Sequence, residues 1–436
     1  MVSQAFSRAA SKLLEECRRQ RLRGRVLRPP NLIGATILGM SLNAKNMHTS
    51  LLDEPREHPE NNAPPGKPGA SKTKRQALSF LEFFAGSGLV AHGMRGLFRP
   101  IWANDIDAKK AAVYEANHAK KRFHLGSISN VAGESLPNAD MAWASFPCQD
   151  LSLAGQAGGI HGKRSGLVWE WLRVIDEMPA PPPILVAENV LGLVSSGAGA
   201  HYRALHRALT ERGYVAGAML LDAERFVPQS RPRIFVVAVK KGMSIPATMV
   251  SDGPNWLHPE AVRRAAQGLP DWIWWRMPEP PKRKVALSDV IEFDAACEEG
   301  TRDDRNIDLI SPKHASILNA LPKKSIFVAP GYKRTRGGNQ VLELRFDNVA
   351  GCLRTPSGGS SRQYLVIREN GALRTRLLTV RETARLMGAP DSYKIPGSYN
   401  DGYKAMGDAV AAPVAKWLGK KLLVPLARLN PDANAS

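Results

Sequence analysis

The feature that most constrains the fold is a regular alternation of short apolar segments and helical patterns between Leu78 and Lys241. The apolar segments are Leu78–Phe84, Ile101–Asn104, Ala139–Ala144, Ile184–Ala187, Val215–Leu221 and Ile234–Val239. Helical patterns occupy several intervals, at Ala108–His118, Leu167–Met178 and His201–Arg212. This alternation predicts an α/β fold with a mostly parallel sheet and helices on both faces. Ligands of such sheets bind at the carboxyl ends of the strands, so we expect the chemistry in the turns that follow them.

The charge of the chain indicates a polyanionic partner. Its 436 residues include 60 Lys and Arg against 40 Asp and Glu, a formal net charge of +20. Such an excess favours nucleic acid first and an anionic membrane surface second, and a generally basic protein without such a partner is the alternative. No apolar run reaches the roughly 18 residues of a membrane-spanning helix, so we expect no membrane partner.

The cysteines indicate the compartment. Four cysteines lie far apart and form no metal-binding pair. This spacing argues against a disulfide framework and a zinc site, so we expect no metal and an intracellular protein. We also expect no secretory signal, because the N-terminal residues lack a short apolar core followed by small residues. The expected location is the cytoplasm, in association with the nucleoid.

Composition divides the chain into six predicted segments. Residues 1–51 form a basic N-terminal extension, with a short amphipathic helix and then six arginines from Arg18 to Arg28. A solvated tail or an Arg-rich targeting segment are the alternatives for this extension. Residues 52–76 are a disordered linker, 77–241 the α/β domain, 242–365 a separate, irregular and basic module, 366–427 a C-terminal segment that completes the α/β domain, and 428–436 a tail.

The turn after the first apolar segment suggests a cofactor site. Phe84–Ala91 satisfies the pattern G-x-G-x-x-G/A ahead of a helix, and Asp105 ends the second segment. The glycines allow a tight turn, and an acid at the second strand can accept hydrogen bonds from ribose hydroxyls. The pattern alone fits NAD, FAD or S-adenosylmethionine, and it also fits a turn that is merely packed.

Three further turns carry reactive side chains. Cys148 follows the third apolar segment, where a nucleophile beside a nucleotide site is expected, although a buried structural cysteine is the alternative. Glu188 ends the fourth segment, and Arg231 and Arg233 precede the last one, two positions apart and on one face. An ion pair of purely structural importance between Glu188 and Arg233 is the alternative.

In order and spacing, these motifs resemble the DNA (cytosine-5-)-methyltransferase family. The matching strings are FAGSGL from Phe84, PCQ at Pro147–Gln149, ENV at Glu188–Val190, QSRPR at Gln229–Arg233, RLLTVRETARLMGAPDSY at Arg376–Tyr393 and GDAVAAPV at Gly407–Val414. The resemblance implies a Rossmann-like S-adenosylmethionine-dependent methyltransferase fold. It also implies that residues 77–241 are catalytic and that 242–365 form a target-recognition domain that binds DNA.

The same resemblance implies methyl transfer to carbon 5 of cytosine in a specific short duplex DNA sequence. Cys148 would add to carbon 6 of the base, and Glu188 would donate a proton to ring nitrogen 3. Arg233, together with Arg231, would hold the base oxygen and orient Glu188. The base would have to flip out of the duplex, and the Gly-rich loop Gln149–Arg164 would close over it.

Cofactor and DNA contacts are likewise implied by the resemblance. The cofactor residues are Phe84, Gly86, Gly88, Asp105 for the ribose, Ile106 for the adenine, Ser127, Pro147, Leu167 and Asp408. Ser127 stands where the family usually has Asp, and Asp408 where Asn is common. The DNA-contacting residues are Gln149, Ser152, Arg164, Arg334, Arg336, Gly337, Gly338, Ser360 and Arg362. For the cluster of Trp272, Trp274 and Trp275 we expect packing and not base stacking.

Three other functions compete with this prediction. Methylation of RNA of the tRNA type would use the same Cys and Glu motifs, and a catalytically idle DNA-binding protein would keep the fold. A nicotinamide oxidoreductase would explain the glycine turn but none of the other motifs. For the leading prediction the expected partner is duplex DNA, a cognate restriction endonuclease is a candidate partner, and we expect a monomer.

Overall fold

A computed structural model describes residues 77–147, 166–322, 324–355 and 361–430. The predicted extension (1–51) and linker (52–76), most of the tail, and the loop Gln149–Arg164 lie outside the described residues. Cys148, Ser152 and Ser360 also lie outside them.

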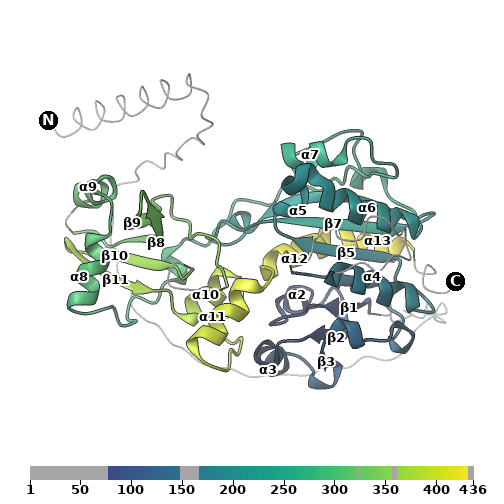
Figure 1. The fold of residues 1–436 in the computed structure, drawn as a ribbon, viewed down its shortest axis with the longest axis horizontal. Helices are drawn as coiled ribbons and strands as arrows, with labels where there is room; N and C mark the ends of the chain where they lie inside the picture. Colours follow the sequence, from purple (N-terminus) through teal and green to yellow (C-terminus); the bar gives the residue numbers. More distant parts are fainter. Residues whose placement is uncertain (1–76, 148–165, 323, 356–360, 431–436) are drawn as a thin grey trace, which may run out of the picture. The chain divides into compact units, whose positions relative to one another are not determined.

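Seven strands form the main sheet. They are β1 (Ser79–Phe83), β2 (Arg99–Asp105), β3 (Phe123–Leu125), β4 (Met141–Ala144), β5 (Ile184–Asn189), β6 (Tyr214–Asp222) and β7 (Pro232–Lys240). Their order is β3-β2-β1-β4-β5-β7-β6 (Figure 1). The pairs among β1 to β5 are parallel, and β7 runs antiparallel to β5 and β6. The predicted mostly parallel sheet is therefore confirmed.

Helices cover both faces of this sheet because its strands are apolar on both sides. Leu81, Ala142 and Leu185 face one hydrophobic cluster, and their chain neighbours Phe80 and Met141 face the other. The first cluster is covered by α4 (Leu167–Glu177), α5 (Gly192–Ser195), α6 (Ala200–Glu211) and α7 (Glu260–Ala266). Alternation of this kind fixes the register of each strand, since a slip by one residue would exchange the two faces.

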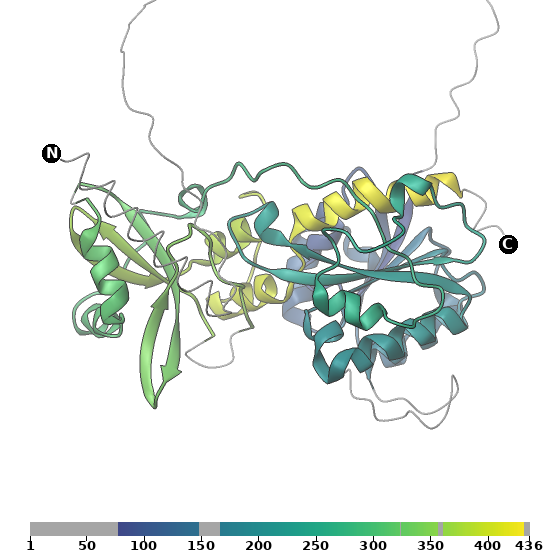
Figure 2. The ribbon, with the colours of Figure 1, turned by 90° about the horizontal axis from the view of Figure 1, so that it is seen from above.

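The second face carries the end of the chain. It is covered by α2 (Leu89–Gly93), α10 (Val380–Leu386), α11 (Tyr399–Asp408), α12 (Ala412–Leu418), a π-helical turn (Gly419–Leu423) and α13 (Val424–Leu429). Figure 2 shows the last helices, in yellow, lying along the sheet. Gly93 in α2 permits this contact, because a Cβ there would lie 2.3 Å from the carbonyl oxygen of Ala412. The helix α3 (Ala108–Asn117) lies beside β2 and β3 (Figure 1).

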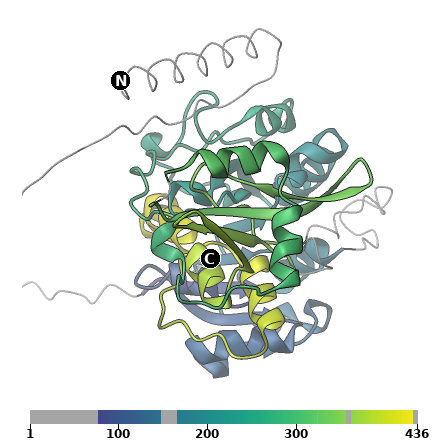
Figure 3. The same cartoon turned by 90° about the vertical axis from the view of Figure 1, so that its left-hand side faces the viewer.

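A second, smaller sheet faces the viewer in Figure 3. Its strands are β8 (Phe327–Arg336), β9 (Asn339–Leu344), β10 (Tyr364–Glu369) and β11 (Ala372–Leu377), all antiparallel, in the order β11-β10-β8-β9. The helices α8 (Thr301–Asp308) and α9 (Pro312–Ala320) accompany it. The smaller domain was expected to be irregular, and the structure instead gives it a regular sheet. These strands were not predicted from the sequence, because Pro330, Gly331 and several charged residues interrupt the alternation of apolar and polar residues along them.

The predicted domain boundaries do not coincide with the two sheets. The boundary at residue 365 falls inside β10, so β10 and β11 belong to the smaller sheet and not to the C-terminal segment. The first part of the predicted module, up to the Trp cluster, packs on the main sheet. Trp275 is buried there and donates its indole N–H to the carbonyl oxygen of Val237 at 3.1 Å. Gly217 allows this approach, because a Cβ at that position would lie 2.0 Å from the carbonyl oxygen of Ile273.

A buried ion pair stabilises the start of α10. Thr379 caps this helix in a capping box with Glu382. The Glu382 carboxylate also accepts two hydrogen bonds from the Arg376 guanidinium at 2.6 and 2.8 Å, and both side chains are almost fully buried. The backbone N–H of Glu292 donates to the same carboxylate at 2.8 Å. Three chain segments therefore meet at one buried charge.

Replacing Glu382 by Gln should lower the free energy of unfolding by about 3 kcal/mol, because the Arg376 guanidinium then stays buried without its counter-charge. Urea denaturation near neutral pH measures the change. The control Glu343→Gln breaks the exposed pair of Glu343 with Arg336, whose atoms lie 2.6 Å apart, and should leave the midpoint nearly unchanged. Equal losses in the two variants would contradict the prediction.

Candidate active site

The glycine turn after β1 has a strained backbone. Phe84, Gly86 and Gly88 all have positive φ angles, of 55°, 54° and 77°. Such a conformation costs a non-glycine residue such as Phe84 on the order of 1–3 kcal/mol, and strain of this kind clusters at functional sites. The Asp105 carboxylate at the end of β2 holds the turn, because it accepts hydrogen bonds from the N–H groups of Gly86 (2.8 Å) and Asp107 (2.9 Å).

The two glycines of the turn serve different purposes. A Cβ at Gly86 would meet nothing closer than 3.9 Å, so this part of the backbone is open to a ligand. A Cβ at Gly88 would lie 2.7 Å from the rings of Tyr114 and His118, so Gly88 allows close packing against α3. Both glycines were predicted to contact the cofactor, and Gly86 has open surroundings for such a contact.

Apolar side chains are exposed at the same edge of the sheet. Ile106, directly after Asp105, is 71% exposed. Leu125 at the end of β3 is paired in register with Asp105 and is 51% exposed. Ile106 was predicted from the sequence, whereas Leu125 was not, because a strand of three residues gives no periodic signal. A buried carboxylate beside exposed apolar groups is a surface suited to a nucleoside, whose ribose is polar and whose base is flat.

The remaining predicted cofactor residues lie on several elements. Ser127 caps a short 3₁₀ helix (Ile128–Asn130) and accepts a hydrogen bond from the N–H of Ser129 at 3.3 Å. Pro147 is exposed at the end of a described segment, and Leu167 is the half-buried first residue of α4. Ser127 is therefore already used as a helix cap, whereas Pro147 and Leu167 have free surface.

Asp408 reaches the glycine turn through Lys110. The two side chains form an ion pair at 2.7 Å, and Asp408 also accepts a hydrogen bond from the Thr355 hydroxyl. The Cδ atom of Lys110 lies 3.9 Å from the position of a Cβ at Gly86. Lys110 could not be predicted from the sequence, because a lysine in an exposed helical pattern gives no functional signal.

A buried carboxyl group lies directly beneath the turn. Glu82 in β1 is buried and accepts a hydrogen bond from the N–H of Ala91 at 3.3 Å, and its second oxygen has no partner among the described residues. Burial raises the pKa of Glu82 from 4.5 to about 8. The hydrogen bond from the Ala91 N–H opposes this rise, and the nearby Asp105 carboxylate adds a smaller increase. Glu82 is therefore neutral at pH 7. Its contribution to the free energy of unfolding is lost as the pH rises.

Replacing Glu82 by Gln removes this titration. The unfolded carboxyl ionises near pH 4.5 and the folded one near pH 8. The wild-type free energy of unfolding should therefore fall between these values by up to about 1.4 kcal/mol per pH unit relative to the variant. Denaturant titrations at several pH values measure the slopes. The exposed Glu134 supplies a control in Glu134→Gln, which should follow the wild-type slope, and parallel curves for Glu82→Gln and wild type would refute the assignment.

A second group of side chains gathers at the end of β5. Glu188 is buried, and its carboxylate oxygen lies 3.2 Å from the Nε atom of Arg233. Burial raises the pKa of Glu188, whereas Arg233, Arg231 and a hydrogen bond with the Ser145 hydroxyl oppose this rise. The group therefore retains a proton more readily than an exposed glutamate does. This is the property required of a carboxyl that donates a hydrogen bond to a substrate.

The two arginines share a face, as the sequence predicted, but their partners differ. Both approach the Cys352 sulfur, Arg231 at 3.4 Å and Arg233 at 3.8 Å. The Arg231 guanidinium also donates to the carbonyl oxygens of Leu353 (3.0 Å), Gly407 (2.8 Å) and Ala409 (2.7 Å). It is 2% exposed, and burial lowers its pKa to about 10. Both Nη groups of Arg231 are thus bound to backbone carbonyls, and its Nε is buried without a partner among the described residues. Among the same residues, one Nη group of Arg233 meets only the sulfur.

The asparagine after Glu188 connects β5 to the turn before Cys148. The Asn189 side chain is buried and donates to the carbonyl oxygen of Phe146 at 2.9 Å, while its own oxygen accepts the N–H of Val190 at 2.8 Å. Phe146 stands two residues before Cys148, the predicted nucleophile, which lies outside the described residues. The turn that leads to Cys148 is therefore bound by Asn189, the residue directly after Glu188 in β5.

Four of the predicted DNA-contacting residues lie on one hairpin. Arg334 and Arg336 belong to β8, and Gly337 and Gly338 form the turn to β9 with positive φ angles. The Arg334 guanidinium stacks over the ring of Tyr332 at 5.1 Å. Such stacking holds a guanidinium in place while leaving its N–H groups able to donate.

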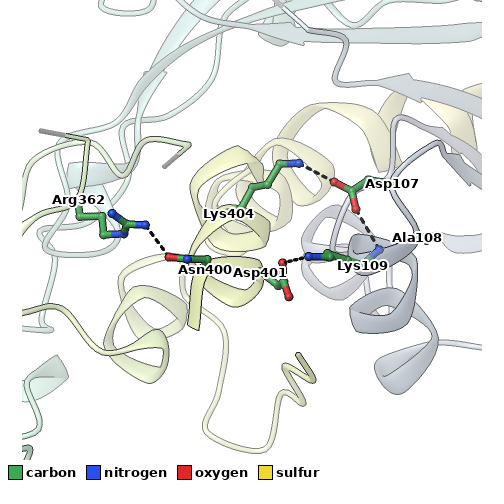
Figure 4. Close-up of a pocket in the computed structure, with 7 residues that line it drawn as sticks. All are labelled: Asp107, Ala108, Lys109, Arg362, Asn400, Asp401 and Lys404. Atoms are coloured by element: carbon green, nitrogen blue, oxygen red, sulfur yellow. Dashed lines mark hydrogen bonds and ion pairs between the residues drawn. The ribbon is translucent and has the colours of Figure 1, made fainter. Parts of the chain in front are cut away.

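Arg362 lies elsewhere, in a pocket between α3 and α11 (Figure 4). It donates to the side-chain oxygen of Asn400 at 2.6 Å. Two ion pairs cross the same pocket, Lys404 with Asp107 at 2.7 Å and Lys109 with Asp401 at 2.6 Å. The cavity has a volume of about 520 Å³. Its charges are largely compensated, and Arg362 is not grouped with the hairpin residues.

Within residues 77–147, 166–322, 324–355 and 361–430, no three His, Cys, Asp or Glu side chains are close enough to bind a metal ion together. No helix in these same segments has the length and apolar character needed to cross a membrane.

The family to which the chain belongs is shown by comparison with known proteins. The model of the family described as C-5 cytosine-specific DNA methylase matches residues 78–423. The chain belongs to this family of cytosine-5 methyltransferases, which confirms the resemblance found in the sequence. Membership implies the use of S-adenosylmethionine.

Alignments with two type II methyltransferases extend over most of the chain. It is 28% identical to the type II methyltransferase M.HpaII of Haemophilus parainfluenzae over 378 residues, which cover 83% of this chain and 94% of the relative. It is 24% identical to the type II methyltransferase M.HhaI of Haemophilus parahaemolyticus over 343 residues, or 78% of this chain and 93% of the relative.

Solved structures show the same fold. A mutant of the Spodoptera frugiperda DNMT2 matches with a TM-score of 0.55 and 17% identity, over 80% of this chain and 99% of the other. The Dnmt2 methyltransferase of S. pombe matches with a TM-score of 0.53 and 17% identity, over 82% of this chain and 100% of the other. At this identity the likeness speaks for the fold alone.

Proposed function

We propose that this protein methylates carbon 5 of cytosine within a specific short sequence of duplex DNA, through a covalent Cys148 adduct on a flipped-out base. The observation that carries the proposal is the buried pair of Glu188 and Arg233 at the end of β5. It lies beside the turn that leads to Cys148, because Asn189 binds the carbonyl oxygen of Phe146. A proton-holding carboxyl beside a thiol is the combination that cytosine activation needs.

The chemistry follows from the electron demand of the ring. The Cys148 thiolate adds to carbon 6, and the electrons of the 5,6 double bond shift toward the ring nitrogen and carbonyl. Glu188 donates its proton to nitrogen 3, and Arg233 binds the carbonyl oxygen, so the negative charge is neutralised as it develops. Carbon 5 then acts as a nucleophile toward the methyl group that a bound donor would supply, and the new carbon–carbon bond forms as the bond from methyl to the donor sulfur breaks. Loss of the carbon-5 proton to a base such as water, departure of the thiolate and return of the nitrogen-3 proton to Glu188 restore the aromatic ring.

S-adenosylmethionine, when bound, supplies an electrophilic methyl group. The residues around the glycine turn suit it, because Gly86 is open, Asp105 has a carboxylate beside the open turn, and Ile106 offers an apolar surface. Asp408, held by Lys110, would place a negative charge near the positively charged end of the cofactor. Pro147 and Leu167 would border the adenine, and Ser127 would act mainly as a helix cap.

We further propose that the hairpin of β8 and β9 binds the duplex. Arg334 and Arg336 would contact phosphates or base edges, and Gly337 and Gly338 would let the turn approach the groove. The relatives named above are type II methyltransferases, which makes a restriction endonuclease of the same specificity a candidate companion. The proposed chemistry requires a single copy of the chain.

Cytosine-5 chemistry can be tested by trapping. A duplex with 5-fluorocytosine at the target should remain covalently bound to the protein in the presence of S-adenosylmethionine, because the fluorine cannot leave as a proton does. Denaturing gels and peptide mapping should locate the adduct at Cys148. Cys148→Ser should lose at least about a thousandfold in methyl transfer and form no adduct, while duplex binding persists. Cys297→Ser is the control and should retain both, and an adduct at another side chain would refute the assigned nucleophile.

The class of nucleic acid can be tested by competition. Duplex DNA should receive the methyl group and compete for binding, whereas tRNA should do neither at equal nucleotide concentration. Affinity for the duplex should fall steeply and linearly with the logarithm of salt concentration, since arginine contacts release counterions from phosphates. Mass spectrometry of the digested nucleic acids identifies the methylated nucleoside. Faster methylation of tRNA than of duplex would overturn the DNA assignment in favour of RNA.

A further inference from the structure

Ser145 lies opposite Glu188 at the carboxyl edge of the sheet. The strands β4 and β5 are parallel and in register, with Ala144 paired to Ala187. One residue further along each strand, Ser145 and Glu188 therefore lie side by side. The Ser145 hydroxyl is also one of the groups that lower the pKa of the Glu188 carboxyl. The sequence analysis did not single out Ser145, because a serine before Phe-Pro-Cys gives no distinctive signal.

The hydroxyl of Ser145 has a second, buried partner. The indole N–H of Trp143 donates to the Ser145 oxygen at 3.0 Å. Trp143 is fully buried, and its ring packs edge-on against Phe235 of β7 with the centroids 6.0 Å apart. The indole is therefore fixed by the core of the domain. It cannot rotate away from the serine without disturbing the packing between β4 and β7.

The direction of the hydrogen bonds follows from the donors available. An indole N–H can only donate, so the Ser145 oxygen accepts from Trp143. The single hydroxyl proton of Ser145 is then free to point to the Glu188 carboxylate. Arg233 binds the same carboxylate at 3.2 Å from another strand. Two donors from different elements therefore fix the plane of the carboxyl group.

We propose that Ser145, itself oriented by Trp143, is a positioning residue that holds the Glu188 carboxyl in the orientation from which it donates to the substrate base. This inference rests on the proposed function and assigns a residue outside its catalytic set. With Arg233 bound to one oxygen of the carboxyl, the proton of Glu188 is directed to the other oxygen. A carboxyl without the serine would lose one of its two fixed donors.

The charged groups around Glu188 determine the sign of the effect on pH dependence. Arg233 reaches it from β7 and Arg231 from the turn before β7, and the Cys352 thiol contacts both guanidinium groups. Each arginine favours the ionised carboxylate, and so does the Ser145 hydroxyl as a donor, whereas burial favours the neutral acid. Removing the hydroxyl therefore raises the pKa of Glu188. Activity that needs protonated Glu188 then persists to higher pH.

Ser145→Ala is the decisive variant. Its methyl-transfer rate should fall about tenfold at neutral pH with little change in the KM for duplex DNA. The alkaline limb of its pH profile should move upward by about one pH unit. Ser145→Thr keeps the hydroxyl and should restore the wild-type profile. Trp143→Phe keeps most of the packing but removes the donor to Ser145, and should give a smaller shift in the same direction.

A matched control exists at the opposite edge of the sheet. Ser79 at the start of β1 donates its hydroxyl to the Asp140 carboxylate at 2.9 Å. Ser79→Ala therefore removes another serine–carboxylate hydrogen bond from the same sheet, far from the strand ends that carry the proposed site. Its pH profile should match that of the wild type. A general loss of stability would reduce activity in both alanine variants without moving either profile.

A second measurement separates this inference from the proposed function. The carboxyl carbon of Glu188, labelled with ¹³C and assigned against Glu188→Gln, titrates in the ligand-free protein whether or not methyl transfer occurs. A higher pKa of Glu188 in Ser145→Ala would support the hydrogen bond. This result would hold even if the protein transferred no methyl group, an outcome that would contradict the proposed function alone. Methyl transfer by the wild type, with an unchanged Glu188 titration and an unchanged pH profile in Ser145→Ala, would overturn the inference.

Discussion

The arrangement of the candidate site depends on the buried guanidinium of Arg231. It joins three carbonyl oxygens that belong to segments 122 to 178 residues further along the chain. A buried cation that lost these acceptors would be uncompensated, so the segments cannot separate without a large cost in free energy. Arg231 therefore fixes the turn before β7. Arg233, two residues later, owes its position beside Glu188 to this anchor.

The same anchor joins the two halves of the site. Gly407 and Ala409, which Arg231 binds, flank Asp408, and Asp408 pairs with Lys110 beside the glycine turn. The end of α11 thus binds Arg231, two residues before the partner of Glu188, and reaches through Lys110 the turn proposed to bind the methyl donor. Methyl transfer requires the two reactants within about 3.5 Å of each other. A shared, buried connection is a direct way to keep their binding sites at a constant separation.

The sequence predicted those parts of the protein whose signal is local. The main sheet followed from apolar segments, and Glu188, Arg233 and Asp105 followed from their places at strand ends. The second sheet could not be predicted, because Pro330 and Gly331 interrupt β8 and its hydrophobic cluster forms only by tertiary packing. The partners of Arg231 were equally hidden, since a motif specifies a residue type and not which distant carbonyls it meets.

The remaining question is how one carboxyl group can be both buried and reactive. Burial alone would keep Glu188 neutral and unoriented, and cations alone would keep it ionised and unable to donate. The structure balances these effects through the register of three strands, with Ser145 directly after β4 and Arg233 at the start of β7, the two strands that flank Glu188 in β5. Asn189 of the same strand as Glu188 donates to the carbonyl oxygen of Phe146, two residues before the proposed nucleophile Cys148. A register slip by one residue would expose the carboxyl and break all three contacts together. The parallel sheet therefore determines the protonation of the site as well as its shape.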